Sequence, residues 1–332
     1  MLKVKISSCK DSERAIQAKE FYRIYKKLKK QNVELVESYD NADVILVTDL
    51  HHKNIYSDVL GNPQHVFHYR KIICFYEMGG SPDSVPGIYT DASIDIPGTR
   101  GAPYYFWLKT HDLPPFENIE KDVRPYLFSF MGRNCNKLRA KILNLSLFNI
   151  SLVDHYLEDT TYSYPDFGSV KSMAVNKKNQ RDKYYNVLKQ SKFVLAPKGA
   201  GLSSIRQYEA MAYGCVPVVI SDKLKQPFAV NWNKCAVQVK ENEIERIPQI
   251  LGDLEGDFLS MSEAAREAYF DLFDPLNYWK YIEDAIIDIY KNDLDKRSPI
   301  INLKFQIFKR TIRRTIYRRK QDMKRAIANI RF

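Results

Sequence analysis

Short apolar segments separated by polar or amphipathic stretches occupy the first 78 residues of the chain. Apolar residues recur every three or four positions over 12–31, which predicts an amphipathic helix. The apolar segments have the length and β-rich composition of buried strands, and strands that alternate with helices imply a parallel sheet. Strands are predicted at 4–9, 33–38, 42–49 and 71–78.

A second alternating run begins at residue 124 and predicts a second parallel sheet. Between the two runs, residues 79–122 are rich in Gly, Pro and Asp, and we expect long loops that lead to a linker. The predicted strands of the second run are 124–133, 149–155, 192–196 and 216–222, and its predicted helices are 136–148, 181–190, 204–213, 243–254, 260–273 and 277–291.

The length of 332 residues accommodates two domains, and the fold class is predicted to be α/β. We predict an N-terminal domain over 1–120, a C-terminal domain over 121–295 and a tail over 296–332. For the helix at 277–291, packing back on the N-terminal domain is left open as an alternative.

The net charge of +11 suggests a nucleic-acid binder until it is located along the chain. The tail holds 13 Lys and Arg residues and one acid, which leaves 38 basic and 39 acidic residues in the rest. Because the body is close to neutral, nucleic acid is not the expected partner of the fold.

Apolar residues in the tail are spaced by threes and fours, with one gap before Met323, and basic residues fill much of the rest. This pattern predicts a basic amphipathic C-terminal helix on an anionic membrane surface. The alternatives are a helix docked on the protein or on a partner, and a nucleic-acid tail. The apolar positions are Ile301, Phe305, Phe308, Ile312, Ile316, Met323, Ile327 and Ile330.

Cysteine spacing and hydropathy predict the compartment. The five cysteines form no Cys-x-x-Cys pair, which favours a reducing compartment without structural zinc. The first residues lack the apolar core of a secretory signal, and no apolar run approaches 18 residues. We therefore expect a cytoplasmic protein, peripheral on the inner face of a membrane.

The segment 192–222 predicts a binding loop between a strand and a helix. Two glycines in the loop 197–204 allow close backbone approach, and Ser203 or Ser204 is expected to cap the next helix. Gly214 suits a left-handed helix end. The helix start favours an anion, most plausibly a diphosphate.

Arg206 and Glu209 lie three residues apart on this predicted helix. A carboxylate repels phosphate, so Glu209 fits a sugar diol better, and a nucleotide offers a ribose diol beside its diphosphate. The alternative is an ordinary solvated ion pair. The loop matches neither the dinucleotide-binding nor the Walker glycine pattern.

Residues 124–133, 184–228 and 231–239 closely resemble the core of the exostosin-family glycosyltransferases in strand order, spacing and residue type. The resemblance covers about 124–240 and is weak over the first 120 residues. It implies the GT-B architecture, in which two Rossmann-like domains face a cleft. The C-terminal domain would hold a nucleotide sugar, the N-terminal domain would hold the acceptor, and no metal ion would be needed.

The resemblance also implies roles for single residues. Glu209 would bind the ribose, and the two loop serines would hold the diphosphate. Asp222 would face the donor sugar or cap the next turn. The residues expected to offset the charge of the leaving diphosphate are Arg133, Lys198 and Arg206.

Position 201 bears on stereochemistry. The segment 208–222 also resembles the retaining GT-B transferases, which carry another Glu eight residues before the one matching Glu209. This chain has Gly201 there, which favours inversion of the anomeric centre.

Inversion needs a base for the acceptor proton. The candidates, each just past an apolar strand, are Asp49, His51 and Glu77.

The sequence thus predicts an inverting glycosyltransferase in surface polysaccharide synthesis. We expect a UDP-linked donor, a glycan or lipid-linked glycan acceptor, and no metal cofactor. The only Asp-x-Asp triplet, 293–295, ends a predicted helix and is discounted as a metal site. The alternatives are a retaining GT-B enzyme, a noncatalytic nucleotide-sugar or glycan binder, and a nucleic-acid binder acting through the tail.

Overall fold

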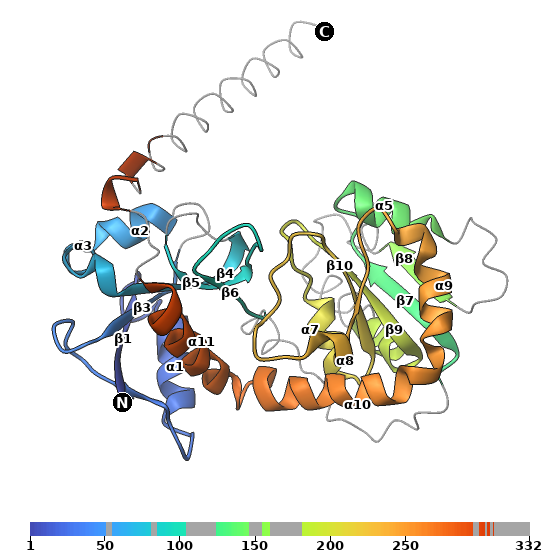
Figure 1. Cartoon of the computed structure of the whole chain (residues 1–332), viewed down its shortest axis with the longest axis horizontal. Helices are drawn as coiled ribbons and strands as arrows, with labels where there is room; N and C mark the ends of the chain where they lie inside the picture. Colours follow the sequence, from blue (N-terminus) through green and yellow to red (C-terminus); the bar gives the residue numbers. More distant parts are fainter. Residues whose placement is uncertain are drawn as a thin grey trace, which may run out of the picture. The chain divides into compact units, whose positions relative to one another are not determined.

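The structure is a computed structural model with two compact units (Figure 1). Unit 1 comprises Met1–Ile88, Ile96–Thr99 and Glu283–Phe332, and unit 2 comprises Tyr89–Asp95 and Arg100–Ile282. The predicted domain boundary at 120/121 lies outside the described residues. The structure describes residues 1–50, 55–80, 85–103, 124–145, 155–159, 181–294, 299–302, 304, 305 and 308.

The first sheet has six strands in the order β2-β1-β3-β4-β5-β6. The pairs β1–β2, β1–β3 and β3–β4 are parallel. All five residues of β3 are buried, as expected of a β-branched apolar run between two neighbours. The strands are β1 (Leu2–Ser8), β2 (Val33–Leu35), β3 (Val44–Thr48), β4 (Ile72–Gly80), β5 (Gly87–Asp91) and β6 (Thr99–Gly101).

Strands β5 and β6 correct the prediction of loops over 79–122. The Gly and Pro residues around them suggested turns, and Gly98, with φ of 73°, does form a turn before β6. The five residues between Gly87 and Asp91 are nevertheless all buried and extend the sheet. Short buried strands between turns are easily mistaken for loops because composition is averaged over the whole segment.

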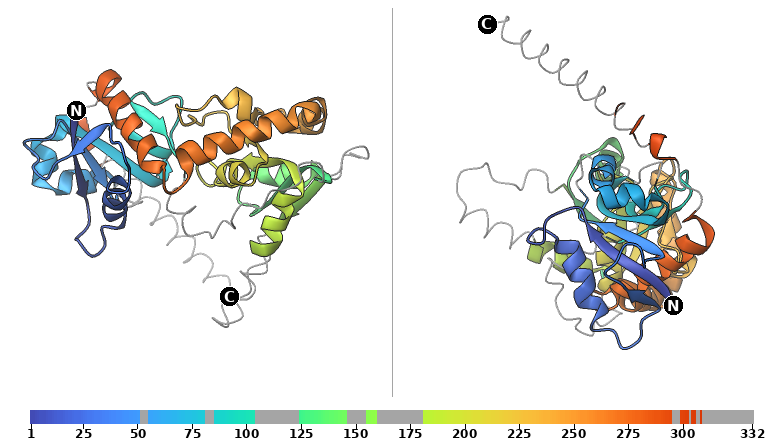
Figure 2. Two further views of the ribbon diagram at one scale, coloured as in Figure 1. Left: turned by 90° about the horizontal axis from the view of Figure 1, so that it is seen from below. Right: turned by 90° about the vertical axis from the view of Figure 1, so that its left-hand side faces the viewer.

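Among the described residues, three helices and one 3₁₀ turn lie between β1 and β4 in sequence, and Figures 1 and 2 show the helices beside the strands of the first sheet. Helix α1 lies inside the predicted 12–31 but is shorter. Asn62 caps α3 through a bond from the amide of Gln64, and Pro63 stands at its first turn. The segments are α1 (Ile16–Tyr25), α2 (Ile55–Gly61), α3 (Pro63–Phe67) and the 3₁₀ turn η1 (Tyr69–Lys71).

The second sheet has five strands in the order β11-β10-β9-β7-β8, and every pair is parallel. The predicted α/β class with two parallel sheets is therefore confirmed. The predicted strand 149–155 is observed only from residue 155 onward, since 146–154 lie outside the described residues. The strands are β7 (Tyr126–Gly132), β8 (His155–Asp159), β9 (Ser191–Pro197), β10 (Val216–Ile220) and β11 (Val237–Gln238).

The core of unit 2 is made by apolar side chains of strands β7, β9 and β10 with helices α5, α9 and α10, and includes Phe128, Phe193 and Val218. Helix α7 packs on β9 and β10. The helices described for this unit are α5 (Lys137–Leu143), a helix at 181–189, α7 (Arg206–Ala212), α8 (Trp232–Cys235), η4 (Ile244–Arg246), α9 (Ile247–Asp253), η5 (Glu255–Asp257), α10 (Phe258–Ala268) and the π-helical η6 (Tyr269–Phe273). The last helix, α11 (Tyr278–Asn292), begins in unit 2, and its residues from Glu283 onward belong to unit 1.

A polar cluster is buried between α3 and β1 in unit 1. The Oγ of Ser7 lies 2.7 Å from both His65 Nε2 and Tyr39 Oη. His65 is fully buried. Because burial disfavours the charged imidazole, the pKa of His65 falls from 6.5 to about 4.

We predict that this cluster makes the protein acid-sensitive. The folded pKa lies below the unfolded one, so the unfolded chain binds more protons between about pH 4 and 6.5. The free energy of unfolding should therefore fall by about 2 to 3 kcal/mol as the pH drops from 7 to 4.5. Urea denaturation at both pH values would measure this. His65→Gln, which does not titrate, should lose less between them; an equal loss would assign the acid sensitivity to other groups.

Candidate functional site

The second sheet has a topological switch point between β7 and β9. From β7 the chain passes to β8 on one side and returns on the other side to form β9. Open parallel sheets bind ligands at such points, beyond the carboxyl ends of the strands. The candidate site is therefore built from the residues that follow Gly132 and Pro197.

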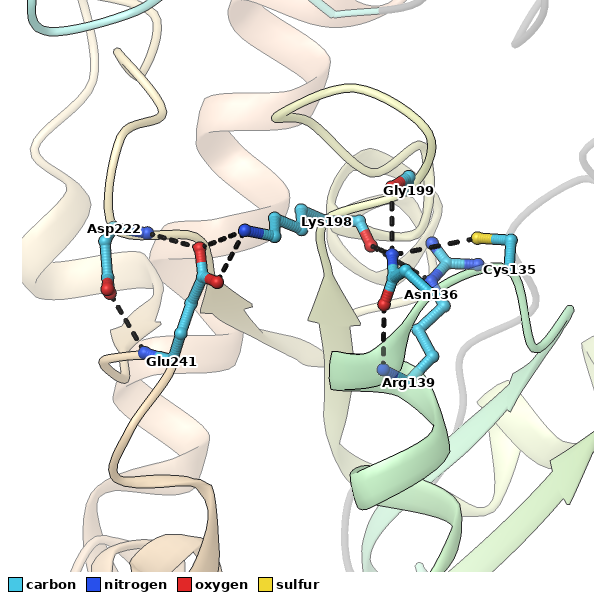
Figure 3. Close-up of polar contacts among 7 residues, drawn as sticks. All are labelled: Cys135, Asn136, Arg139, Lys198, Gly199, Asp222 and Glu241. Atoms are coloured by element: carbon cyan, nitrogen blue, oxygen red, sulfur yellow. Dashed lines mark hydrogen bonds and ion pairs between the residues drawn. The ribbon is translucent and has the colours of Figure 1, made fainter. Parts of the chain in front are cut away.

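Asn136 ties the loop after β7 to the loop after β9 (Figure 3). It is the N-cap of α5, where its Oδ1 accepts a bond of 2.9 Å from the amide of Arg139. Its Nδ2 donates to the carbonyl oxygens of Lys198 at 3.1 Å and Gly199 at 3.0 Å. One side chain thus starts a helix and fixes the backbone beyond β9.

Arg139 makes further bonds to the same two loops. Its side chain is buried, with the residue 5% exposed. Its guanidinium donates to three carbonyl oxygens, at 3.0 to 3.1 Å, and lies 5.7 Å from the centre of the Phe130 ring. The three acceptors are Arg133, Pro197 and Lys198. We call Asn136 and Arg139 the α5 clamp.

Sequence analysis missed both residues of the α5 clamp. An Asn at the start of the predicted helix 136–148 is an N-cap signal and could have identified Asn136. Arg139 carries no comparable signal, because it bonds carbonyl groups that lie up to 59 residues away in sequence.

The loop after β9 closes on itself and is anchored by Asp91. The amide of Gly199 donates to the carbonyl of Ser203 at 3.1 Å, and the amide of Ser203 donates to Asp91 Oδ1 at 2.7 Å. The hydroxyl oxygens of Ser203 and Ser204 are buried and have no partner among the described residues. Because buried polar groups are almost always paired, these two hydroxyls indicate a place for ligand oxygens.

Neither serine caps α7, which corrects the prediction. The N-cap residue is Ile205, and no side chain caps the helix. Ser204 contributes its carbonyl oxygen instead, which accepts from the amide of Gln207 at 3.2 Å. This main-chain turn forms the start of α7 and leaves the hydroxyl groups unused.

The far end of α7 is confirmed as a left-handed glycine cap. Gly214 has φ of 65°. Its amide donates to Met211, and the amide of Cys215 donates to Ala210, which is the Schellman pattern. The short helix therefore has a defined length and direction.

Arg206 extends from α7 to the end of β7. Its Nε donates to the carbonyl of Met131 at 2.8 Å, and its guanidinium lies 5.3 Å from the centre of the Phe130 ring. A Cβ at Gly132 would come within 2.3 Å of Arg206 Nη2, so glycine leaves room for this close approach. Arg133, the next residue, has an exposed side chain at the same strand end.

Glu209, also on α7, is 4% exposed and contacts a different residue from those that Arg206 contacts. Its Oε2 accepts a bond of 2.6 Å from the Tyr184 hydroxyl. Burial, followed by the nearby carboxylate of Glu209, raises the pKa of Tyr184 well above its usual value, so the tyrosine remains a donor. No ion pair joins Arg206 to Glu209 in the part of the chain that the structure describes, so these residues are not an ordinary solvated pair.

Lys198 and Asp222 both contact Glu241, a residue that sequence analysis did not select (Figure 3). Lys198 Nζ lies 2.6 and 2.5 Å from the two carboxylate oxygens of Glu241. Asp222 Oδ1 accepts from the amide of Glu241 at 2.9 Å. The described contacts of the Asp222 side chain thus join the end of β10 to the segment after β11, 19 residues away in sequence.

The candidate bases lie in unit 1. Asp49 Oδ1 accepts from the amide of Gln17, and its Oδ2 accepts from the amide of Ala18 and the Thr48 hydroxyl. These contacts are those of a cap at the start of α1. Glu77 is buried on β4, and His51 lies outside the described residues.

Comparison with known families identifies the region of this site. Residues 112–254 match the family model described as the exostosin GT47 domain. We therefore refer to residues 112–254 as the GT47 domain, after the family model that they match. Within the described part of 112–254, the domain includes the α5 clamp, the loop after β9, α7 and Glu241.

Known proteins similar to the chain include exostosins from animals. An exostosin-1 homolog of Caenorhabditis elegans is 34% identical over 128 residues, which is 38% of this chain and 33% of that protein. Mouse exostosin-1 is 27% identical over 215 residues, 61% of this chain and 28% of that protein. The chain thus spans about a third or less of the length of these relatives.

Among solved structures, the lipopolysaccharide outer core galactosyltransferase WaaB has a TM-score of 0.45 and 11% identity, covering 86% of this chain and 99% of that chain.

The described residues contain no group of three or more His, Cys, Asp or Glu side chains placed to hold a metal ion. The discounted triplet is only partly described, because Asp295 lies outside the described residues.

We predict that the loop after β9 needs glycine at position 201, because Asp91 anchors the loop beside that position. A Cβ at this position would lie 1.9 Å from Asp91 Oδ2, so Gly201→Ala should displace Asp91 from the amide of Ser203. We expect a loss of about 1 to 3 kcal/mol in the free energy of unfolding, measured with urea. Gly252→Ala is the control, since its Cβ would meet nothing within 4 Å. Equal stability of the two variants would contradict the packing described.

Proposed function

We propose that the GT47 domain transfers a sugar from a nucleotide-sugar donor, expected to be UDP-linked, to a glycan acceptor. One observation carries the proposal: the loop at the switch point combines two buried unpaired hydroxyls with Arg206 at one strand end and the buried carboxylate of Glu209. Hydroxyl and guanidinium groups suit a diphosphate, and a carboxylate suits a ribose diol.

The contacts of Glu209 support its role toward ribose. Tyr184 holds Oε2, while Oε1 accepts no bond from the described side chains. A ribose hydroxyl could therefore donate to Oε1 without breaking the existing bond. Arg206 and Arg133 would offset the charge that grows on the diphosphate as the sugar leaves.

We propose transfer with inversion, since position 201 carries no carboxylate. One observation favours retention as a second candidate: the carboxylate of Asp91 occupies the space that a side chain at position 201 would enter. Analysis of the product anomer separates the two. A noncatalytic donor or glycan binder would instead bind without transfer or hydrolysis.

The acceptor base stays a prediction. The capping contacts of Asp49 give it a structural role, so Glu77 and His51 are the candidates that we favour. We also propose that the reaction needs no metal cofactor, which follows from the family resemblance and is tested by adding a chelator.

For the acceptor we propose a lipid-linked glycan in surface polysaccharide synthesis, at the cytoplasmic face of a membrane. The tail supports this because Ile301 and Phe308, seven positions apart, are 68% and 61% exposed. The tail over 296–332 holds 13 Lys and Arg residues and one acid, and anionic lipid attracts such segments. No helix among the described residues is long and apolar enough to span a membrane.

We predict that Glu209→Ala weakens donor binding by about 1 to 3 kcal/mol, the cost of leaving a ribose hydroxyl unpaired. Calorimetric titration of UDP and UDP-sugars, with and without EDTA, would measure this. The control is Glu267→Ala, an exposed glutamate on α10. Unchanged affinity in Glu209→Ala would remove the ribose role. The absence of binding by the natural chain to any nucleotide or nucleotide sugar would overturn the proposed function.

We also predict that the full chain sediments with phosphatidylcholine vesicles only when they contain phosphatidylserine, and that added salt reverses this. Replacing Ile301 and Phe308 by Gln should weaken the binding, because it removes apolar area from the interface. Equal sedimentation with neutral vesicles would contradict an electrostatic contribution. Binding to RNA that survives both substitutions would favour the nucleic-acid alternative.

A further inference from the structure

The carboxyl ends of β9, β10 and β11 are linked by one charged network (Figure 3). Lys198 follows β9, Asp222 follows β10 and Glu241 follows β11. Both oxygens of Glu241 contact Lys198 Nζ, and Glu241 Oε1 also accepts from the amide of Asp222 at 3.3 Å. One ammonium group is therefore bonded to one carboxylate, and Asp222 holds that carboxylate in place through backbone contacts.

The network has a fixed part and a movable part. Glu241 and Asp222 exchange hydrogen bonds through each other's backbone amide, so their positions depend on two main-chain contacts. The backbone of Lys198 is held by the α5 clamp. Its side chain is long and 30% exposed, and Glu241 is its one bonding partner among the described residues. Lys198 Nζ is thus the group that can change partner.

A diphosphate at the loop after β9 would compete with Glu241 for this ammonium group. Both are oxyanions, and one Lys cannot neutralise them together at this site. We propose that Glu241 is a built-in competitor: the donor diphosphate displaces it from Lys198, and Glu241 takes Lys198 back when the nucleoside diphosphate leaves. This inference rests on the proposed function and adds an affinity-setting residue to it.

The exchange has two consequences. The apparent dissociation constant for a nucleoside diphosphate is the intrinsic constant divided by the fraction of molecules in which Glu241 does not occupy Lys198, so the competition raises it. Release of the product is correspondingly faster, because Glu241 competes for the ammonium group from a fixed position. Removing the charge of Glu241 should therefore tighten binding and slow release.

The test is a double-mutant cycle with UDP as the probe, measured by calorimetry on the full chain. Glu241→Gln should tighten UDP binding about three- to tenfold, in line with a partly exposed ion pair. Lys198→Gln should weaken it, and adding Glu241→Gln to that variant should change nothing further. Stopped-flow release of UDP should slow in Glu241→Gln.

A matched control is available in the same unit. Lys192 and Glu255 form an ion pair away from the switch-point residues, and Glu255→Gln should leave UDP affinity unchanged. If Glu241→Gln folds poorly by circular dichroism, Glu241→Asp serves instead, because the shorter carboxylate should hold Lys198 less well and tighten UDP binding in the same direction.

Two results would overturn the inference while leaving the proposed function intact. UDP affinity that is unchanged or weaker in Glu241→Gln would exclude competition. UDP affinity that is unchanged in Lys198→Gln would make the pair purely structural. In either case the proposed donor site stands if the natural chain binds UDP or another nucleotide and Glu209→Ala weakens that binding.

Discussion

The candidate site depends on how the backbone carbonyl groups beyond β7 and β9 find hydrogen-bond donors. A parallel sheet satisfies its backbone only as far as the strands run, and buried carbonyls beyond that edge need other partners. Here the α5 clamp supplies them, from the side-chain Nδ2 of Asn136 and the guanidinium of Arg139. Bonds from a charged donor are among the stronger ones in proteins. The loop that contains Gly199 and Gly201 is therefore held in one shape despite its glycines.

This constraint separates the charged groups of the site into two kinds. Arg206 is held by a carbonyl and an aromatic ring, and Glu209 is held by a tyrosine hydroxyl. Such groups need no reorganisation when charge develops on a ligand, which is how preorganised electrostatics acts. The α5 clamp holds the backbone of Lys198, while its ammonium group bonds Glu241, which the proposed diphosphate would displace. Fixed groups would recognise the nucleotide, whereas the movable one would adjust how tightly it is held.

Periodicity and turn chemistry predicted most elements of the fold, because these depend on residues close in sequence. The two parallel sheets and the glycine end of α7 are of this kind. Strands β5 and β6 were not predicted, because their glycine- and proline-rich surroundings suggested loops. Sequence analysis missed the partners of the site residues for another reason. Asp91, Glu241 and Tyr184 contact residues that lie 25 to 112 positions away in the sequence. No local pattern marks a residue whose role depends on such a contact.

Position 201 shows how one contact can explain a departure from a related family's pattern. A side chain there and the carboxylate of Asp91 would occupy the same space, so the loop carries glycine. Asp91 is 4% exposed, and its Oδ1 is held by the amide of Ser203. A carboxylate that leaves this bond to reach a sugar would also release the loop that carries Ser203 and Ser204. The same contact that anchors this loop therefore opposes a direct chemical role for Asp91, which supports the inversion that we propose.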